Sequence, residues 1–201
     1  MNASGETVQA GRLLVDDFLP RYDVTQVHRV LVAASPASAY ELVRAVDVMQ
    51  SRLVRALVWT QGFPEQLIRR ARGLPTRVVA PAHAGFDDML ATKAWVLLAE
   101  EPGRDLVLGL LWPFGRAVPR IPAVDPSQWA AFTEPGYAKV VWSLSVHSFG
   151  AGRTLVISEA RTAATDGRTA RRFRLMWRGP GPFGALLKWR MLRMIQAGAR
   201  R

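Results

Sequence analysis

The sequence contains no cysteine, only three histidines and no long uninterrupted apolar run. The absence of cysteine excludes disulfides, thiolate zinc sites, iron–sulfur clusters and a cysteine nucleophile. Three histidines, His28, His83 and His147, do not indicate a histidine-rich metal site. No stretch of 18 apolar residues is present to span a bilayer, and residues 1–11 lack the basic start and apolar run of a secretory signal. We therefore expect a cytoplasmic protein without a metal site.

The composition is that of a globular protein. Of 201 residues, 49% are hydrophobic and 21% are charged, which is enough apolar material for one buried core. The sequence predicts an N-terminal arm over residues 1–20 and a single domain over residues 21–201. Apolar side chains near the end of the arm would allow part of it to dock on the domain.

Positive charge is concentrated at the C-terminal end. Ten basic residues and no acidic one lie between Arg168 and Arg201, so with a net charge of +11 the rest of the chain is nearly neutral. Such a block suits an anionic membrane surface, nucleic acid or an acidic partner. A helix that packs its apolar stripe on the domain and turns its arginines to water has the same pattern, and we favour that interpretation. An anionic membrane remains a candidate partner, nucleic acid is not expected, and the oligomeric state is left open.

Several segments show the β-branched, alternating pattern of strands. They are bounded by turn residues such as Pro102-Gly103 and Gly150 to Gly152. The predicted strands cover residues 24–34, 95–100, 105–112, 138–149 and 154–163.

Helices are expected before and after these strands. Ser35-Pro36 is a typical helix start, and the spacing of apolar residues predicts helices over 36–46, 51–59 and 65–71. Residues 113–126 contain four prolines and should form a loop over a cavity. The terminal helix is expected over 169–177 and 183–197, with a break or kink at the Gly-Pro repeat between.

Four segments together resemble the helix-grip fold of the START and Bet v 1-like superfamily, which includes polyketide cyclases. They are the strand and helix of residues 27–43, the hairpins of residues 95–112 and 135–166, and the helical segments of residues 168–195. The resemblance implies an α+β fold in which a curved antiparallel sheet wraps around a long, kinked C-terminal helix. It also implies a cavity between sheet and helix for a small hydrophobic ligand such as a lipid or polyketide. It carries over no catalytic motif, because fold alone does not determine function.

Alternation along the last hairpin gives the candidate ligand-binding residues. If even positions on the first strand lie opposite odd positions on the second, Trp142 and Leu144 share the apolar face with Glu159 and Arg161. The two charged groups would then face the cavity and either orient a polar ligand group or pair with each other. Trp129 is expected at the cavity mouth. On the terminal helix, the apolar stripe adds Phe183 and Leu187.

Three functions remain open on this basis. The favoured one is binding of a small hydrophobic or amphipathic molecule. The second is a cyclase or dehydratase-like enzyme in which Glu159 is the general acid or base. The third is peripheral attachment to an anionic membrane through the basic C-terminal helix. No nucleotide-binding, serine-hydrolase or zinc-protease motif is present, and no cofactor is expected.

Overall fold

The computed structural model describes residues 13–56, 73, 83–114, 122, 124–150, 152–177 and 180–200. The predicted helix over 65–71 and most of the predicted loop over 113–126 lie outside these residues. Within the described ranges, no helix is long and apolar enough to cross a membrane.

Five strands of the described chain form one antiparallel sheet in the order β1-β5-β4-β3-β2. Their bounds are Val24–Val32 (β1), Trp95–Glu101 (β2), Asp105–Pro113 (β3), Tyr137–Ser148 (β4) and Thr154–Ala164 (β5). The predicted strands are confirmed, with small differences at their ends. Each edge strand has one neighbour, and β4 and β5, the longest strands, lie in the interior of the sheet.

The register of the last hairpin differs from the predicted one. Ser148 lies opposite Thr154, with five residues between them, and Trp142 lies opposite Ala160. An odd number of intervening residues pairs positions of equal parity, so even residues of β4 share a face with even residues of β5. The expectation that Trp142 shares a face with Glu159 and Arg161 was therefore wrong.

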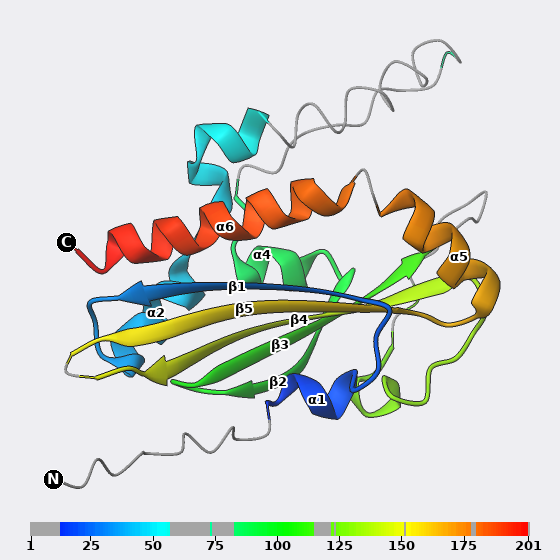
Figure 1. Cartoon of the computed structure of the whole chain (residues 1–201), viewed down its shortest axis with the longest axis horizontal. Helices are drawn as coiled ribbons and strands as arrows, with labels where there is room; N and C mark the ends of the chain where they lie inside the picture. The colour runs from blue at the N-terminus through cyan, green and yellow to red at the C-terminus, as the bar shows by residue number, and fades with distance from the viewer. Residues whose placement is uncertain are drawn as a thin grey trace, which may run out of the picture.

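One face of the sheet, called here the helix face, is covered by α2, α4 and α6 (Figure 1). These helices are Pro36–Ala45, Phe86–Ala91 and Pro180–Gly198, and the 3-10 turn η1 (Val48–Gln50) follows α2. As predicted, Ser35 caps α2, since its Oγ accepts a hydrogen bond from the Ser38 backbone N–H at 3.2 Å. The core on this face joins buried side chains of all three helices, among them Val43, Phe86 and Ile195, to the sheet.

The opposite face, called here the outer face, is covered by α1 (Val15–Phe18) and by the turn η2 (Pro126–Gln128) with the residues after it. Val15 is 1% exposed, so part of the predicted N-terminal arm docks on the sheet. Trp129 is fully buried on this face, above Gly109 of β3. A Cβ at position 109 would lie 2.8 Å from the Trp129 ring, so this strand position must be glycine for the ring to pack there.

The C-terminal segment is two helices rather than one. α5 (Gly167–Met176) ends near Trp177 and α6 begins at Pro180, so two helical segments are confirmed, but the second begins three residues before the predicted position 183 and includes most of the Gly-Pro repeat. Pro180 and Pro182 lie in the first turn of α6, where a backbone without an N–H loses no helical hydrogen bond. The predicted α+β class, with a C-terminal helix along an antiparallel sheet, is confirmed.

The edge strand β2 contains a bulge. Its pairing with β3 shifts by one residue between Leu97 and Ala99. The extra residue brings Glu100 to the helix face, where its carboxylate accepts a hydrogen bond from the Tyr40 hydroxyl of α2. Burial and this hydrogen bond raise the pKa of Tyr40 well above its usual value.

Candidate functional site

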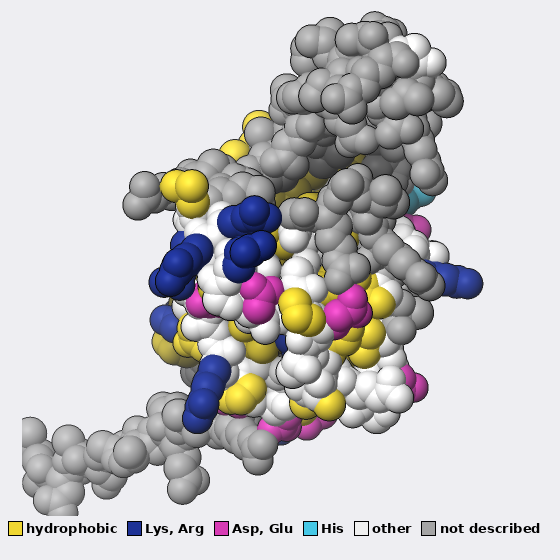
Figure 2. Space-filling view, turned by 90° about the vertical axis from the view of Figure 1, so that its right-hand side faces the viewer, with side chains coloured by type: hydrophobic (Ala, Val, Ile, Leu, Met, Phe, Trp, Pro, Cys, Tyr) yellow, Lys and Arg dark blue, Asp and Glu magenta, His cyan; other side chains and the backbone are white. Residues whose placement is uncertain are grey.

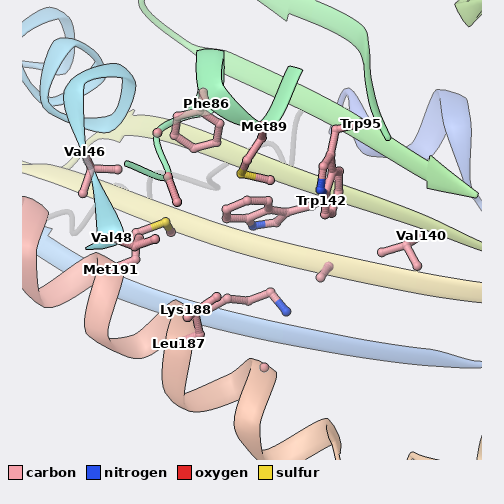
Figure 3. A pocket seen from close by; sticks show the side chains of 14 residues that line it. Val46, Val48, Phe86, Met89, Trp95, Val140, Trp142, Leu187, Lys188 and Met191 are labelled. Atoms are coloured by element: carbon pink, nitrogen blue, oxygen red, sulfur yellow. The ribbon is translucent and has the colours of Figure 1, made fainter. Parts of the chain in front are cut away.

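A cavity of about 180 Å³ lies between the sheet and α6 on the helix face (Figure 3). Its walls come from three parts of the fold. The sheet contributes Trp95, Val140, Trp142 and Ala160; α6 contributes Gly184, Leu187, Lys188 and Met191; the segment from α2 to α4 contributes Val46, Val48, Ala84, Gly85, Phe86 and Met89. The cavity is smaller than the roughly 300–1,000 Å³ of typical drug-sized pockets. It suits a single ring or a short chain.

Aromatic rings form one side of the cavity. The Trp142 ring centroid lies 5.5 Å from that of Phe86 and 6.0 Å from that of Trp95. The Trp142 indole N–H donates to the Ser158 hydroxyl at 2.9 Å, so the polar atom of the ring is satisfied by the sheet. The rings therefore offer an apolar, fixed surface to a guest.

Lys188 is the charged side chain among the described residues that line the cavity. It arises on α6 and lies between this helix and the sheet, with its amine end directed into the space that Figure 3 shows. Its Nζ donates to Oε1 of Gln26 on β1 at 2.8 Å. Burial lowers the pKa of Lys188 to about 8, so the amine is mostly protonated at pH 7.

No carboxylate of the described chain forms an ion pair with this ammonium group; burial alone accounts for the shift in its pKa. His28, on the same face of β1 as Gln26, is the nearby titratable group, and burial followed by the charge of Lys188 lowers its pKa. His28 is thus neutral at pH 7. A lysine ammonium has three N–H donors, and Gln26 accepts from one of them. The site therefore holds a half-buried cation beside an apolar cavity.

The structure separates the predicted ligand-binding residues into groups. Trp142 and Leu187 line the cavity, as expected. Leu144 lies on the same face as Trp142 but is buried in the core and does not line the cavity. The side chain of Phe183 lies outside the described residues.

Glu159 and Arg161 do not face the cavity. Both lie on the outer face, and Arg161 Nε donates to Glu159 Oε1 at 2.7 Å. Arg161 also donates through Nη1 to Asp16 Oδ1 at 2.6 Å and to the Leu19 carbonyl at 3.1 Å. The two charges therefore hold the α1 segment on the sheet. The sequence-based prediction put them on the cavity side because it paired even positions of β4 with odd positions of β5.

Trp129 does not lie at the cavity mouth either. It is buried on the outer face, and its backbone carbonyl accepts a hydrogen bond from Lys139 Nζ at 2.6 Å. The same amine contacts the carbonyls of Ala130 and Phe132 at 3.1 and 3.4 Å. The segment is thereby fixed against the sheet, on the side opposite the cavity.

Sequence reasoning missed Lys188, although a signal was available. Gly184, Leu187, Lys188 and Met191 follow the i, i+3, i+4, i+7 spacing of one helix face. A lysine within that apolar stripe is unusual, because charged residues normally occupy the polar face. The pattern is easily missed because Lys188 is also one of the ten basic residues between Arg168 and Arg201.

Comparison with known proteins gives fold similarity at low scores. No family model and no curated protein sequence matches the chain. Similar solved structures include a protein of Thermus thermophilus, with 10% identity, TM-score 0.33 and coverage of 88% of this chain and 97% of that one. The Zhui aromatase/cyclase of Streptomyces sp. R1128 has 15% identity, TM-score 0.32 and coverage of 89% and 94%. Ara h 8.0201 has 9% identity, TM-score 0.23 and coverage of 84% and 97%. We base the fold on the sheet and helices described above.

Proposed function

We propose that this protein binds a small, mostly apolar molecule in the cavity between the sheet and α6. The observation that carries the proposal is the cavity itself, about 180 Å³ and lined by apolar and aromatic side chains. Native cores are packed to crystal-like density, so a cavity of this size sacrifices packing energy. A guest that fills it recovers those contacts and is fixed by the aromatic side formed around Trp142.

The position of Glu159 disfavours the cyclase-like alternative in the form predicted from the sequence. The proposed general acid or base is paired with Arg161 on the outer face. Among the described lining residues, no carboxylate or histidine takes its place.

Filling the cavity tests the proposal. Ala160 lines the cavity from β5, and Ala160→Phe would occupy the space of a guest. We expect octan-1-ol to bind the wild-type protein with one site by calorimetry and to change its tryptophan fluorescence, since Trp95 and Trp142 line the cavity. Ala160→Phe should abolish both signals. Val27→Phe, on an exposed position of β1, is the matched control and should leave them unchanged.

The circular dichroism spectrum of each variant checks that the sheet is intact. Leu187→Phe fills the same cavity from α6 and provides a second obstruction if Ala160→Phe does not fold. Binding of octan-1-ol to folded Ala160→Phe and Leu187→Phe with wild-type affinity, or no binding to the wild-type protein, would refute the proposal.

A second function, attachment to an anionic membrane, is favoured by the surface of α5. Arg168, Arg171, Arg172 and Leu175 follow i, i+3, i+4, i+7 spacing on one exposed helix face, and Leu175 is 71% exposed. The opposite face of the helix packs Phe173 on the domain. Basic side chains gather on this end of the molecule (Figure 2). A leucine among arginines suits insertion between anionic lipid headgroups.

Vesicle sedimentation tests this function. We expect the protein to pellet with vesicles of phosphatidylcholine mixed with phosphatidylserine, not with phosphatidylcholine alone, and to dissociate as salt rises. Replacing Arg168, Arg171 and Arg172 by serine should abolish pelleting, and Leu175→Ser should weaken it at constant charge.

The matched control removes equal charge elsewhere, at Arg21, Arg29 and Arg52, which are exposed outside α5. If this control loses pelleting as fully as the α5 variant, net charge rather than the α5 face is responsible. Tighter binding to a DNA duplex than to the mixed vesicles would likewise contradict the membrane assignment.

A further inference from the structure

We infer that Lys188 recognises an acidic group, so that the cavity selects a small carboxylic acid with an apolar body. The inference rests on the proposed function and specifies the ligand class. It is carried by the position of a half-buried ammonium group at the wall of an apolar cavity.

An unpaired charge at this position is costly. Lys188 is half-buried, and among the described residues its amine donates one hydrogen bond, to the neutral amide oxygen of Gln26. A buried charge without a counter-ion is unfavourable, and such charges are normally paired. On the outer face, Arg161 contacts two carboxylates and Lys139 contacts three backbone carbonyls. Lys188, which borders the cavity, has the amide oxygen of Gln26 in their place.

The surroundings of the amine also favour an acidic ligand. Lys188 faces β1, β5, β4 and the α2–α4 segment across the cavity, and the described lining side chains of these elements include no carboxylate. His28 on β1 is neutral at pH 7, because burial and Lys188 lower its pKa. A ligand carboxylate therefore finds a cation and, among the described lining side chains, no competing anion.

A glycine leaves room for a ligand beside the amine. Gly184 lies one helical turn before Lys188, and a Cβ built there would be 3.9 Å from Lys188 Nζ and 3.6 Å from Gln26 Oε1. The absence of a side chain at this lining position keeps the approach to the ammonium open. The aromatic side around Trp142 would then contact the apolar body of the ligand (Figure 3).

The experiment compares octanoate with octan-1-ol, two probes of equal chain length that differ in charge. At pH 7 we expect the wild-type protein to bind octanoate about tenfold more tightly than the alcohol, or better, by calorimetry. In Lys188→Met this preference should disappear or reverse, while binding of the alcohol is retained. The control Arg193→Met removes an exposed charge of the same helix and should keep the preference.

A pH series on the wild-type protein gives a second measurement that needs no variant. The pKa of Lys188 is about 8, so the preference for octanoate should be lost between pH 7 and pH 10 as the amine loses its proton. Equal binding of both probes by the wild-type protein, or an unchanged preference in Lys188→Met, would overturn the assignment to Lys188 alone. Failure of both probes to bind would overturn the proposed function together with this inference.

Discussion

Charged side chains lie against both faces of the sheet, buried on the outer face and half-buried on the helix face, and their partners differ. On the outer face, Arg161 contacts Glu159 and Asp16, and Lys139 contacts three backbone carbonyls. On the helix face, Lys188 has an amide oxygen on one side and an apolar cavity on the other. A buried charge whose partners are all supplied by the chain stabilises the chain. A charge that borders the cavity is available to a ligand. This difference is the reason for proposing a structural role for Arg161 and a ligand-binding role for Lys188.

The largest expected effect comes from breaking the outer network. Arg161→Met leaves Glu159 and Asp16 without their cation, and removing one partner of a buried pair costs about 3–5 kcal/mol. We expect that loss in the free energy of unfolding from urea denaturation. Adding Glu159→Gln to the variant should recover part of it.

Ligand binding should not depend on the ion pairs of the outer face. Because the network lies on the face opposite the cavity, Glu159→Gln alone should leave the affinity for octan-1-ol unchanged by calorimetry. A large change in affinity would mean that the two faces are coupled and that the separation drawn above fails.

Lys188→Met should raise the free energy of unfolding at neutral pH, in contrast to Arg161→Met, which should lower it. Burial lowers the pKa of Lys188 from 10.5 to about 8, which corresponds to a cost of roughly 3 kcal/mol for the charged form. Between pH 8 and 10.5 the unfolded chain binds more protons at this lysine than the folded protein does. The wild-type free energy of unfolding should therefore rise with pH in this window relative to that of Lys188→Met. Denaturation curves of both proteins at pH 7 and pH 10.5 measure the difference, which should nearly vanish at the higher pH.

Overpacking the outer face should lower the free energy of unfolding by a smaller amount than the loss of Arg161. In Gly109→Ala the new Cβ meets the Trp129 ring at 2.8 Å and the Leu98 side chain at 2.9 Å. Such crowding typically costs about 1–3 kcal/mol. The smaller ring in the double variant with Trp129→Phe should relieve part of the clash. A thermal unfolding midpoint that does not change in Gly109→Ala would show that the ring can move aside.

The smallest effect is expected from Trp142→Phe on the helix face. The variant removes the indole donor from the fully buried Ser158 hydroxyl, a loss of about 1 kcal/mol. The smaller ring also widens the cavity, so the affinity should shift toward longer alcohols. Calorimetry with hexan-1-ol, octan-1-ol and decan-1-ol would detect the shift, and an unchanged order of affinities would contradict the placement of Trp142 at the cavity wall.

The sequence predicts the elements of this fold better than their relative orientation. The strands and the Ser35 cap are visible locally, because alternation and capping depend on neighbouring residues. The face on which Glu159 lies depends on the parity of a hairpin loop, and one residue of error moves a whole strand to the other side. Trp129 could not be placed, because its position depends on a glycine in a distant strand. The helical spacing that Lys188 shares with Leu187 and Met191 is visible in the sequence, but the cavity beside the lysine forms only when α6 packs on the sheet.

The bulge in β2 has a consequence beyond the contact of Glu100 with Tyr40. β2 borders the sheet, and a straight border strand presents a regular row of amides and carbonyls that a strand from another molecule can extend. The extra residue at Leu98 interrupts that row midway along the strand. The irregularity that turns a carboxylate inward therefore also makes this border a poor template for intermolecular β-pairing, which favours solubility at high concentration.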